Sequence, residues 1–165
     1  MAFSLIPRYS FRKITDISPD FLKELGIRFL MLDLDNTVAA YSESLPSVTV
    51  KHWMTEIKTH GIEVFIVSNS VRKIRVEAFA EALDVAFVLG ASKPSPKGVI
   101  LAMEKSGFSA EESALIGDQV YTDTLSANRA GVFSIIVSPR RFTNPFLVLR
   151  YALEVPFRVL CKNKM

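Results

Sequence analysis

The chain of 165 residues is 49% hydrophobic, which fits a single domain, 1–165, with a sizeable core and leaves little room for a second one. One cysteine, Cys161, excludes an internal disulfide, and the opening MAFSLIPRYSF lacks the uninterrupted apolar core of a secretory leader, so we expect a reducing, cytoplasmic setting. Residues 139–165 carry six basic groups and one acidic group, whereas residues 31–138 carry nine basic and thirteen acidic ones. This distribution indicates a cation site in the body and an anionic partner at the ends, although ordinary solvated charge explains the N-terminal share equally well.

Apolar runs of strand length alternate along the chain with stretches of helical period. A helix over 18–25, opened by Ser18 and Pro19 and closed by Gly26, precedes the first strand. The sequence then predicts strands over 29–33, 63–68, 85–89, 113–117 and 133–138, and helices over about 47–60, 71–83, 96–106 and 122–130. Strict alternation of strand and helix predicts an α/β fold in which a five-stranded parallel sheet is covered on both faces.

Polar loops follow four of these strands, at the sheet edge where α/β proteins bind their ligands. The loops are Asp33-Leu34-Asp35-Asn36-Thr37, Ser68-Asn69-Ser70, Ser92-Lys93-Pro94, and Gly117-Asp118 with Asp123 further on. Each loop alone is a common turn or helix cap. All four at one edge, in this order, indicate a phosphate site.

Together the loop residues match what the hydrolysis of a phosphate monoester requires. Asp33 and Asp118 can hold a hard cation such as Mg²⁺, which offsets the repulsion between a carboxylate nucleophile and a phosphate dianion. Lys93 supplies a compact positive charge, and the Ser68 hydroxyl can bind a phosphoryl oxygen. Asp35 is then available to protonate the leaving alcohol and later to activate water.

These residues resemble the four motifs of the haloacid dehalogenase-like (HAD) phosphatases. The motifs are DLDNT at 33–37, SN at 68–69, KP at 93–94 and GDQVYTD at 117–123. The resemblance runs from about Leu30 to Val137 and implies the Rossmann-like three-layer sandwich of that superfamily, with a core over about 27–140. The aspartate at position 35 makes this sequence similar to the phosphatases of the superfamily and unlike its ATPases and dehalogenases.

The resemblance also implies a role for each motif residue. Asp33 corresponds to the nucleophile, and Asp35 to the acid/base, whose backbone carbonyl also binds the metal. Asp118 corresponds to the principal metal ligand, alongside Asp33. Among the remaining positions, the resemblance implies phosphate binding by Ser68 and Asn69, the motif lysine at Lys93, and supporting roles for Thr37 and Asp123.

Lys97 is an alternative to Lys93, because both follow the third strand. We favour Lys93, since Lys-Pro directly after the strand matches the motif, whereas Lys97 falls in the first turn of the next helix.

The spacing of the motifs predicts that the domain has no cap. The stretches from Asp33 to Ser68 and from Ser68 to Lys93 have room only for a short flap and single crossovers. The site should therefore be open, which favours substrates with a bulky or membrane-held remainder. The alternative is that a flap over 39–46 covers a small substrate.

The segment 144–162 predicts a basic, apolar C-terminal helix, with Thr143 or Asn144 as N-cap, Pro145 at the first position, and a kink or division at Pro156. Polar residues recur every four positions on this segment and form one stripe along the helix, which consists of Arg150, Glu154, Arg158 and Lys162. The helix is too short and too charged to span a bilayer. It could lie on a membrane surface, or pack on the body or on a second copy in a homo-oligomer.

The substrate is the least determined feature. The motifs, the absence of a cap and the basic tail resemble the subfamily IIIA, YqeG-type group, which includes phosphatidylglycerophosphate phosphatases, so the resemblance implies a phosphorylated lipid head group and a protein peripheral to the membrane. Arg140 and Arg141 could bind a second phosphate there, or form a solvated loop pair. The alternatives are a soluble phosphorylated metabolite, nucleotide or protein as substrate, or an interaction module. Nucleic acid is the least favoured partner, because the basic residues lack an accompanying aromatic pattern.

Overall fold

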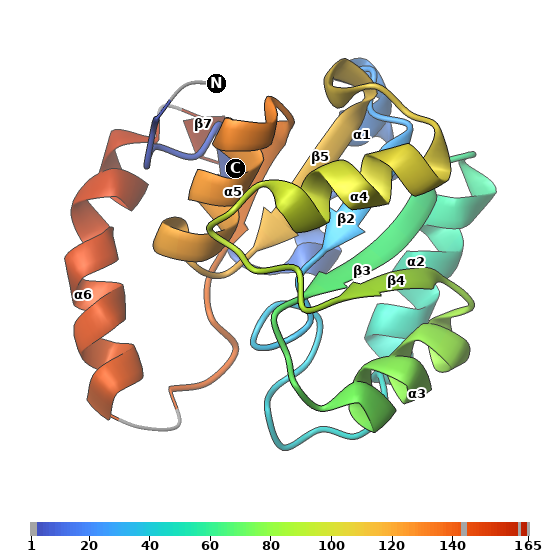
Figure 1. The fold of residues 1–165 in the computed structure, drawn as a ribbon, viewed down its shortest axis with the longest axis horizontal. Coiled ribbons are helices and arrows are strands. Elements are labelled where there is room, and N and C mark those ends of the chain that lie inside the picture. The colour runs from blue at the N-terminus through green and yellow to red at the C-terminus, as the bar shows by residue number, and fades with distance from the viewer. Residues whose placement is uncertain (1–2, 143–144, 162, 165) are drawn as a thin grey trace.

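The sheet is seven-stranded and entirely parallel, with the order β4-β3-β2-β5-β6-β1-β7 (Figure 1). The computed structural model describes residues 3–142, 145–161 and 163–164. The strands are β1 (Tyr9–Phe11), β2 (Phe29–Leu32), β3 (Glu63–Ser68), β4 (Ala86–Leu89), β5 (Ser113–Gly117), β6 (Phe133–Val137) and β7 (Asn163–Lys164).

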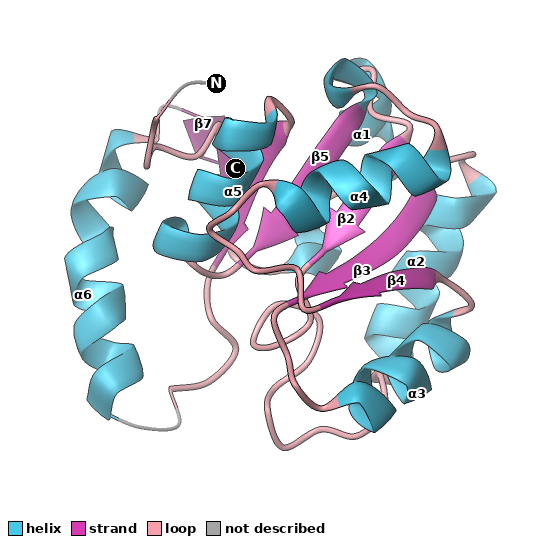
Figure 2. Ribbon diagram, viewed as in Figure 1, coloured by secondary structure: helices cyan, strands magenta, loops and turns pink. Residues whose placement is uncertain are grey.

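Helices cover both faces of the sheet, which gives the expected three-layer sandwich (Figure 2). One face packs on α1 (Pro19–Glu24), α2 (Val48–Thr59) and α3 (Lys73–Leu83), and the other on α4 (Lys97–Ser106) and α5 (Leu125–Ala130). The short turns are η1 (Ile14–Asp16), η2 (Ala110–Glu112) and η3, a π-helical turn over Val120–Thr124. Within the described ranges, no helix is long and apolar enough to cross a membrane.

The α/β prediction is confirmed, but the expected strand number was too low. The five expected strands are β2 to β6, each within one residue of its expected ends. The sequence analysis missed β1, which pairs with β6, and β7, which pairs with β1. Two or three residues are too few to show the period of a strand, so only their pairing in the folded sheet reveals β1 and β7.

The central strand β2 fixes the position of the first motif. All four of its residues are buried, and it lies between β3 and β5, with Leu32 opposite both Ile66 and Ile116. Because the strands are parallel and in this register, the chain leaves all three at one edge. No inserted domain interrupts the chain between Asp33 and Lys93, as expected for a protein without a cap.

The C-terminal helix α6 spans Pro145–Leu160 and runs along the side of the molecule (Figure 1). It begins at Pro145 as predicted, whereas the expected N-cap residues 143–144 lie outside the described residues. We expected Pro156 to kink or divide the helix; it does not divide it, because α6 continues through this residue. Pro156 and Ala152, whose carbonyl loses its helical donor, are both exposed, so water can replace the missing hydrogen bond.

Candidate active site

A small cavity of about 170 Å³ opens at the carboxyl ends of β2, β3 and β5. Its lining includes residues from all four motifs: Asp33, Asp35, Tyr41, Ser68, Asn69, Ser70, Lys93, Gln119 and Thr122. Tyr41, in the flap over 39–46, was not among the predicted site residues. Gln119 and Thr122 lie within the fourth motif, and the π-helical turn of η3 brings them to the cavity.

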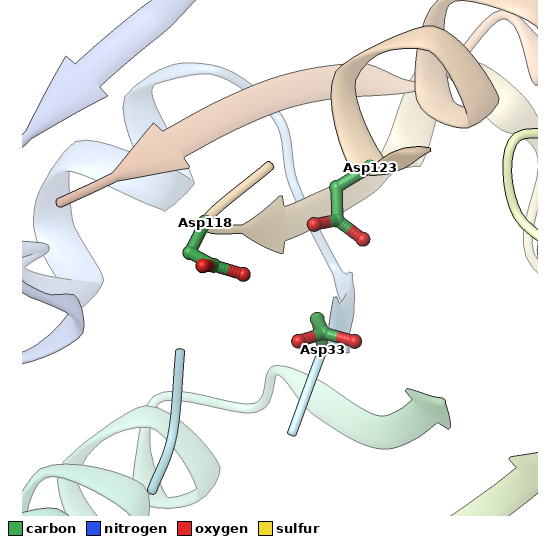
Figure 3. Close-up of side chains that lie close together, drawn as sticks. All are labelled: Asp33, Asp118 and Asp123. Carbon is green, nitrogen blue, oxygen red and sulfur yellow. The ribbon is translucent and has the colours of Figure 1, made fainter. Parts of the chain in front are cut away.

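Three buried carboxylates meet beside this cavity (Figure 3). Asp33 follows β2, Asp118 follows β5 and Asp123 lies in η3, and one oxygen of each lies within 4.8 Å of the other two. Both oxygens of Asp118 are buried, and neither has a hydrogen-bond partner among the described residues. Orphaned carboxylate oxygens facing other carboxylates are unfavourable unless a cation lies among them, so this donor set fits a divalent metal that takes oxygen ligands.

Lys93 joins two of these acids. Its Nζ lies 2.6 Å from Asp33 Oδ1 and 2.7 Å from Asp123 Oδ1, and it donates to the carbonyl of Val67 at 2.9 Å. Burial alone would lower the pKa of Lys93, but Asp123 and Asp33 beside it raise the pKa above its ordinary value. The lysine is therefore a fixed positive charge next to the candidate nucleophile, and its ammonium pairs with two of the three clustered carboxylates.

Burial and the neighbouring acids raise the pKa values of two of the carboxyl groups. Burial raises the pKa of Asp33 from 3.8 to about 7; Asp123 and Asp35 also raise it, and Lys93 opposes them. Burial, followed by the proximity of Asp123 and Asp33, raises the pKa of Asp118 well above its ordinary value. A divalent cation among these oxygens would favour the ionised form of both groups.

Gly117 makes the close approach of Asp123 possible. A Cβ at this position would lie 2.2 Å from Cγ of Asp123, far inside van der Waals contact. Only glycine therefore allows the chain to turn back after β5 and place Asp123 over the strand end, next to Lys93. The backbone N–H of Gln119 donates to Asp123 Oδ2 at 3.0 Å and fixes the carboxylate.

Asn69 holds the loop that carries Lys93. Its amide donates to the Lys93 carbonyl at 2.8 Å and accepts from the Lys93 N–H at 2.9 Å. Ser68 is buried at the cavity wall, and its hydroxyl accepts from the Ser70 N–H at 3.0 Å. Lys97 is exposed at the start of α4, so the structure brings Lys93, and not Lys97, to the acids.

Asp35 has a partner that the sequence analysis missed. Nη1 of Arg75 on α3 lies 2.6 Å from Oδ1 of Asp35, and both side chains are largely buried. The same guanidinium donates to the carbonyls of Ala40 and Glu43, so it ties the flap to the candidate acid/base. Arg75 lies in a helix with no motif around it, and no sequence signal distinguishes it from a surface arginine.

Arg140, Arg141 and Thr37 lie apart from the catalytic cavity. Arg140 donates to the Val38 carbonyl at 2.7 Å and pairs with Glu43 at 3.2 Å, so it holds the flap from the opposite side. It lines a neighbouring cavity of about 320 Å³, together with Thr37. Arg141 is exposed.

Known proteins are similar to this chain in sequence. A family model for haloacid dehalogenase-like hydrolases matches residues 7–131. The probable phosphatase YqeG of Bacillus subtilis (strain 168) is 34% identical over 159 residues, which cover 96% of this chain and 91% of that protein. The chloroplastic/mitochondrial phosphatidylglycerophosphate phosphatase 1 of Arabidopsis thaliana is 28% identical over 158 residues, which cover 87% of this chain but 44% of that protein.

A solved structure shows the same fold. The cobalt-bound deoxy-D-mannose-octulosonate 8-phosphate phosphatase of Haemophilus influenzae superposes with a TM-score of 0.58 at 22% identity, over 76% of this chain and 75% of that one. The family model covers most of the chain, and its motifs converge on one acid-lined cavity. The chain therefore belongs to the haloacid dehalogenase-like hydrolase family, and it is a phosphatase.

Proposed function

We propose that this protein is a Mg²⁺-dependent phosphate-monoester hydrolase that works through an aspartyl-phosphate on Asp33. The observation that carries the proposal is the pairing of Asp33 with Lys93 at 2.6 Å, beside the orphaned oxygens of Asp118. A carboxylate nucleophile needs such a fixed cation, together with a metal, before it can approach a phosphate dianion.

In the first step, Asp33 attacks phosphorus and the bond from phosphorus to the ester oxygen breaks. Asp35 gives its proton to the departing alkoxide, which leaves as an alcohol. In the second step, Asp35 takes a proton from water as that water attacks phosphorus. The bond to the Asp33 oxygen then breaks, which releases inorganic phosphate and restores the carboxylate.

The metal would be held by the side chains of Asp33 and Asp118 and by the backbone carbonyl of Asp35. When bound, Mg²⁺ offsets the negative charge of the phosphate and of the acids around it. Lys93 and Ser68, which both line the cavity, bind phosphoryl oxygens, and Asn69 keeps Lys93 in place. Asp123 orients Lys93 from the far side.

For the substrate, we propose a phosphorylated lipid head group, as in phosphatidylglycerophosphate, bound at a membrane surface. The matched region of the plant phosphatidylglycerophosphate phosphatase supports this choice. Exposed apolar side chains also stand close along the chain to residues of the site: Val71 directly follows Ser70, Ile74 lies in the first turn of α3, and Leu45 lies in the flap. Apolar groups in these segments suit a substrate whose remainder is acyl chains.

The outer surface of α6 supports contact with the membrane. Every exposed residue of α6 is apolar: Pro145, Phe146, Val148, Leu149, Ala152, Leu153, Val155, Pro156, Val159 and Leu160. In the sequence, basic residues stand on both sides of this helix, at 140–141 before it and at 162 and 164 after it. An apolar face between cations fits an anionic lipid surface, with the helix lying in the interface.

The second candidate is a phosphatase for a soluble phosphorylated metabolite. The observation that favours it is the flap, because Tyr41 lines the small cavity and Arg75 and Arg140 hold the flap from both sides. A fixed flap excludes water from a small ester without any lipid. An interaction module would not require the cluster of buried acids, so we rank it third.

A phosphate-release panel with Mg²⁺ tests the proposal. It compares phosphatidylglycerophosphate in mixed micelles with sugar phosphates and nucleotides, and uses Asp33→Asn as the blank. We expect kcat/KM for the lipid to exceed that for every soluble ester by at least about 100-fold, a difference of about 2.7 kcal/mol. Preference for a soluble ester would replace the lipid assignment, and activity retained in Asp33→Asn would overturn the mechanism.

A further inference from the structure

The side of α6 that faces the body is its polar one. The buried positions of this helix are Leu147, Glu154 and Arg158, and Arg150 is largely buried beside Glu154. We call Arg150, Glu154 and Arg158 the inner stripe. An amphipathic helix on a protein surface ordinarily buries its apolar face. The burial of the charged inner stripe must therefore be explained by the contacts that it makes with the body.

Arg158 explains this burial, because its side chain donates to the main chain at Asp118, next to the candidate metal site. Its Nη2 donates to the main-chain carbonyl of Asp118, and its Nη1 donates to the carbonyl of Val137 at 3.1 Å. Glu154 accepts from Nη2 at 3.1 Å, so the buried guanidinium is paired. One side chain on α6 thus bridges the loop after β5 and the end of β6.

A second set of contacts joins α6 to the same loop. The Tyr121 hydroxyl in η3 donates to the Leu153 carbonyl at 3.1 Å, and the ring of Tyr121 meets the ring of Phe157 at a centroid distance of 6.0 Å. The segment between Asp118 and Asp123 is therefore fixed from outside by a helix that lines no part of the catalytic cavity. Asp118 and Asp123, at the two ends of this segment, both belong to the cluster of buried acids.

We propose that Arg158 is a positioning residue for Asp118, and that α6 serves the active site by holding this loop. The inference rests on the proposed cation site. Asp118 is the only one of the three acids whose carboxylate has no hydrogen bond or ion pair among the described residues, so nothing but its backbone orients it. Fixing the Asp118 carbonyl sets where that backbone lies, and so aims the carboxylate at Asp33. Such outer support commonly changes metal affinity by about 10–100-fold.

The alternative is that Arg158 acts only through its charge. Arg150 offers a matched comparison, because it is a second cation of the inner stripe that lies 3.9 Å from Glu154. If charge is what matters, Arg158→Lys should keep Mg²⁺ affinity and Arg150→Met should raise it, because Arg150 is a positive charge that acts on Asp118 and repels a bound cation. If positioning is what matters, Arg158→Lys should weaken Mg²⁺ binding, because an ammonium cannot reach both carbonyls with the planar geometry of a guanidinium.

The experiment is a calorimetric titration of Mg²⁺ into the full chain without substrate, with the melting temperature of each variant recorded alongside. We expect Arg158→Lys to bind Mg²⁺ about tenfold more weakly, and Arg150→Met to bind as the wild type does. Tyr121→Phe, which removes the hydrogen bond to Leu153 and keeps the ring, should weaken binding about threefold and provides a test if Arg158→Lys does not fold. With substrate, the apparent Mg²⁺ requirement of Arg158→Lys should rise while KM for p-nitrophenyl phosphate stays the same.

The possible outcomes separate this inference from the proposed function. Wild-type affinity in Arg158→Lys, or in Tyr121→Phe where Arg158→Lys is unfolded, overturns the positioning role and leaves the phosphatase mechanism intact. A loss in Arg150→Met as large as that in Arg158→Lys also overturns it, because the loss would then follow from any disturbance of the inner stripe and not from the contact with the Asp118 carbonyl. A wild-type chain that binds no Mg²⁺ overturns the proposed cation site, and the inference with it.

Discussion

The carboxyl group of Asp33 is buried beside two other acids, so protons and a cation compete for it. Its folded-state pKa of about 7 lies above the ordinary 3.8, and the pKa of Asp118 is raised in the same direction. A metal must displace these protons, so Mg²⁺ affinity should increase as the pH rises through about 7 and should fall below it. If one proton is displaced, the affinity falls about tenfold for each pH unit below that point.

Calorimetry between pH 5.5 and 8 checks this prediction. Titrations in two buffers of different ionisation enthalpy would count the protons released on binding. Affinity that stays constant over this range, with no proton release, would contradict the prediction.

Arg75 is the residue whose removal should separate proton transfer from metal binding. It contacts Asp35 and two flap carbonyls but none of the three clustered acids. We expect Arg75→Ala to lower kcat about 10–100-fold, because a loosely held acid/base loses much of a contribution that is typically about 10²–10⁴-fold. Mg²⁺ affinity should remain unchanged.

A neighbouring arginine offers the control for this variant. Arg72 reaches the same flap through the Tyr41 carbonyl, at 3.4 Å, but does not contact Asp35. Arg72→Ala should therefore keep kcat within about twofold. Equal losses in the two variants would indicate that flap anchoring, and not the contact with Asp35, explains the effect.

At the scale of elements, α6 turns its apolar face to solvent and its polar face to the body, the reverse of a typical surface helix. Its exposed residues are apolar, including Leu149 at 60% exposure and Leu153 at 57%. We expect Leu149→Ser/Leu153→Ser to reduce binding to phosphatidylglycerol vesicles by at least about tenfold, because each buried leucine contributes about 1.5–3 kcal/mol. The melting temperature should change little, since both side chains already face solvent.

Flotation of the protein with such vesicles measures this effect. Leu101→Ser is the matched control, because Leu101 is an exposed leucine on α4, at 40%, away from the proposed docking face. Flotation that the double variant leaves unchanged would remove the membrane role of α6. A dimer in the wild type that the double variant converts to a monomer would show that a second copy covers this face.

At the scale of the whole molecule, the acid cluster lowers stability in the absence of metal. Asp33 and Asp123 share one lysine, and Asp118 has no hydrogen-bond partner for either oxygen among the described residues. Asp118→Asn removes a buried carboxyl group whose ionised form is disfavoured there, and supplies an amide donor, so the metal-free variant should melt higher than the wild type. For a chain of this size, each kcal/mol corresponds to about 2–4 °C.

The same variant should lose the stabilisation that Mg²⁺ gives to the wild type. A ligand that binds only the folded state raises the melting temperature, and Asp118→Asn removes one of the side chains proposed to hold the metal. Thermal scans with EDTA and with excess Mg²⁺ measure both effects. A variant that melts lower than the wild type in EDTA would show that Asp118 stabilises the fold itself.

The sequence by itself determined that the sheet is parallel and which loops line the cavity at its edge. Alternating strand and helix patterns require parallel strands, and parallel strands bring their carboxyl ends to one edge, so Asp33, Ser68, Lys93 and Asp118 had to lie close together. This reasoning placed the strands β2 to β6 and the cavity at their carboxyl ends. It missed β1 and β7, which are too short to show a period.

Only the tertiary structure decided which partners these residues have. Helical periodicity reveals a polar stripe on α6, but it does not say whether that stripe faces water or the body, and here it faces the carbonyl of Asp118. The pairing of Arg75 with Asp35 joins α3 to the loop after β2, and no local pattern encodes it. Spacing along the chain fixes which residues share an edge, whereas the contacts between packed elements fix how each side chain is held.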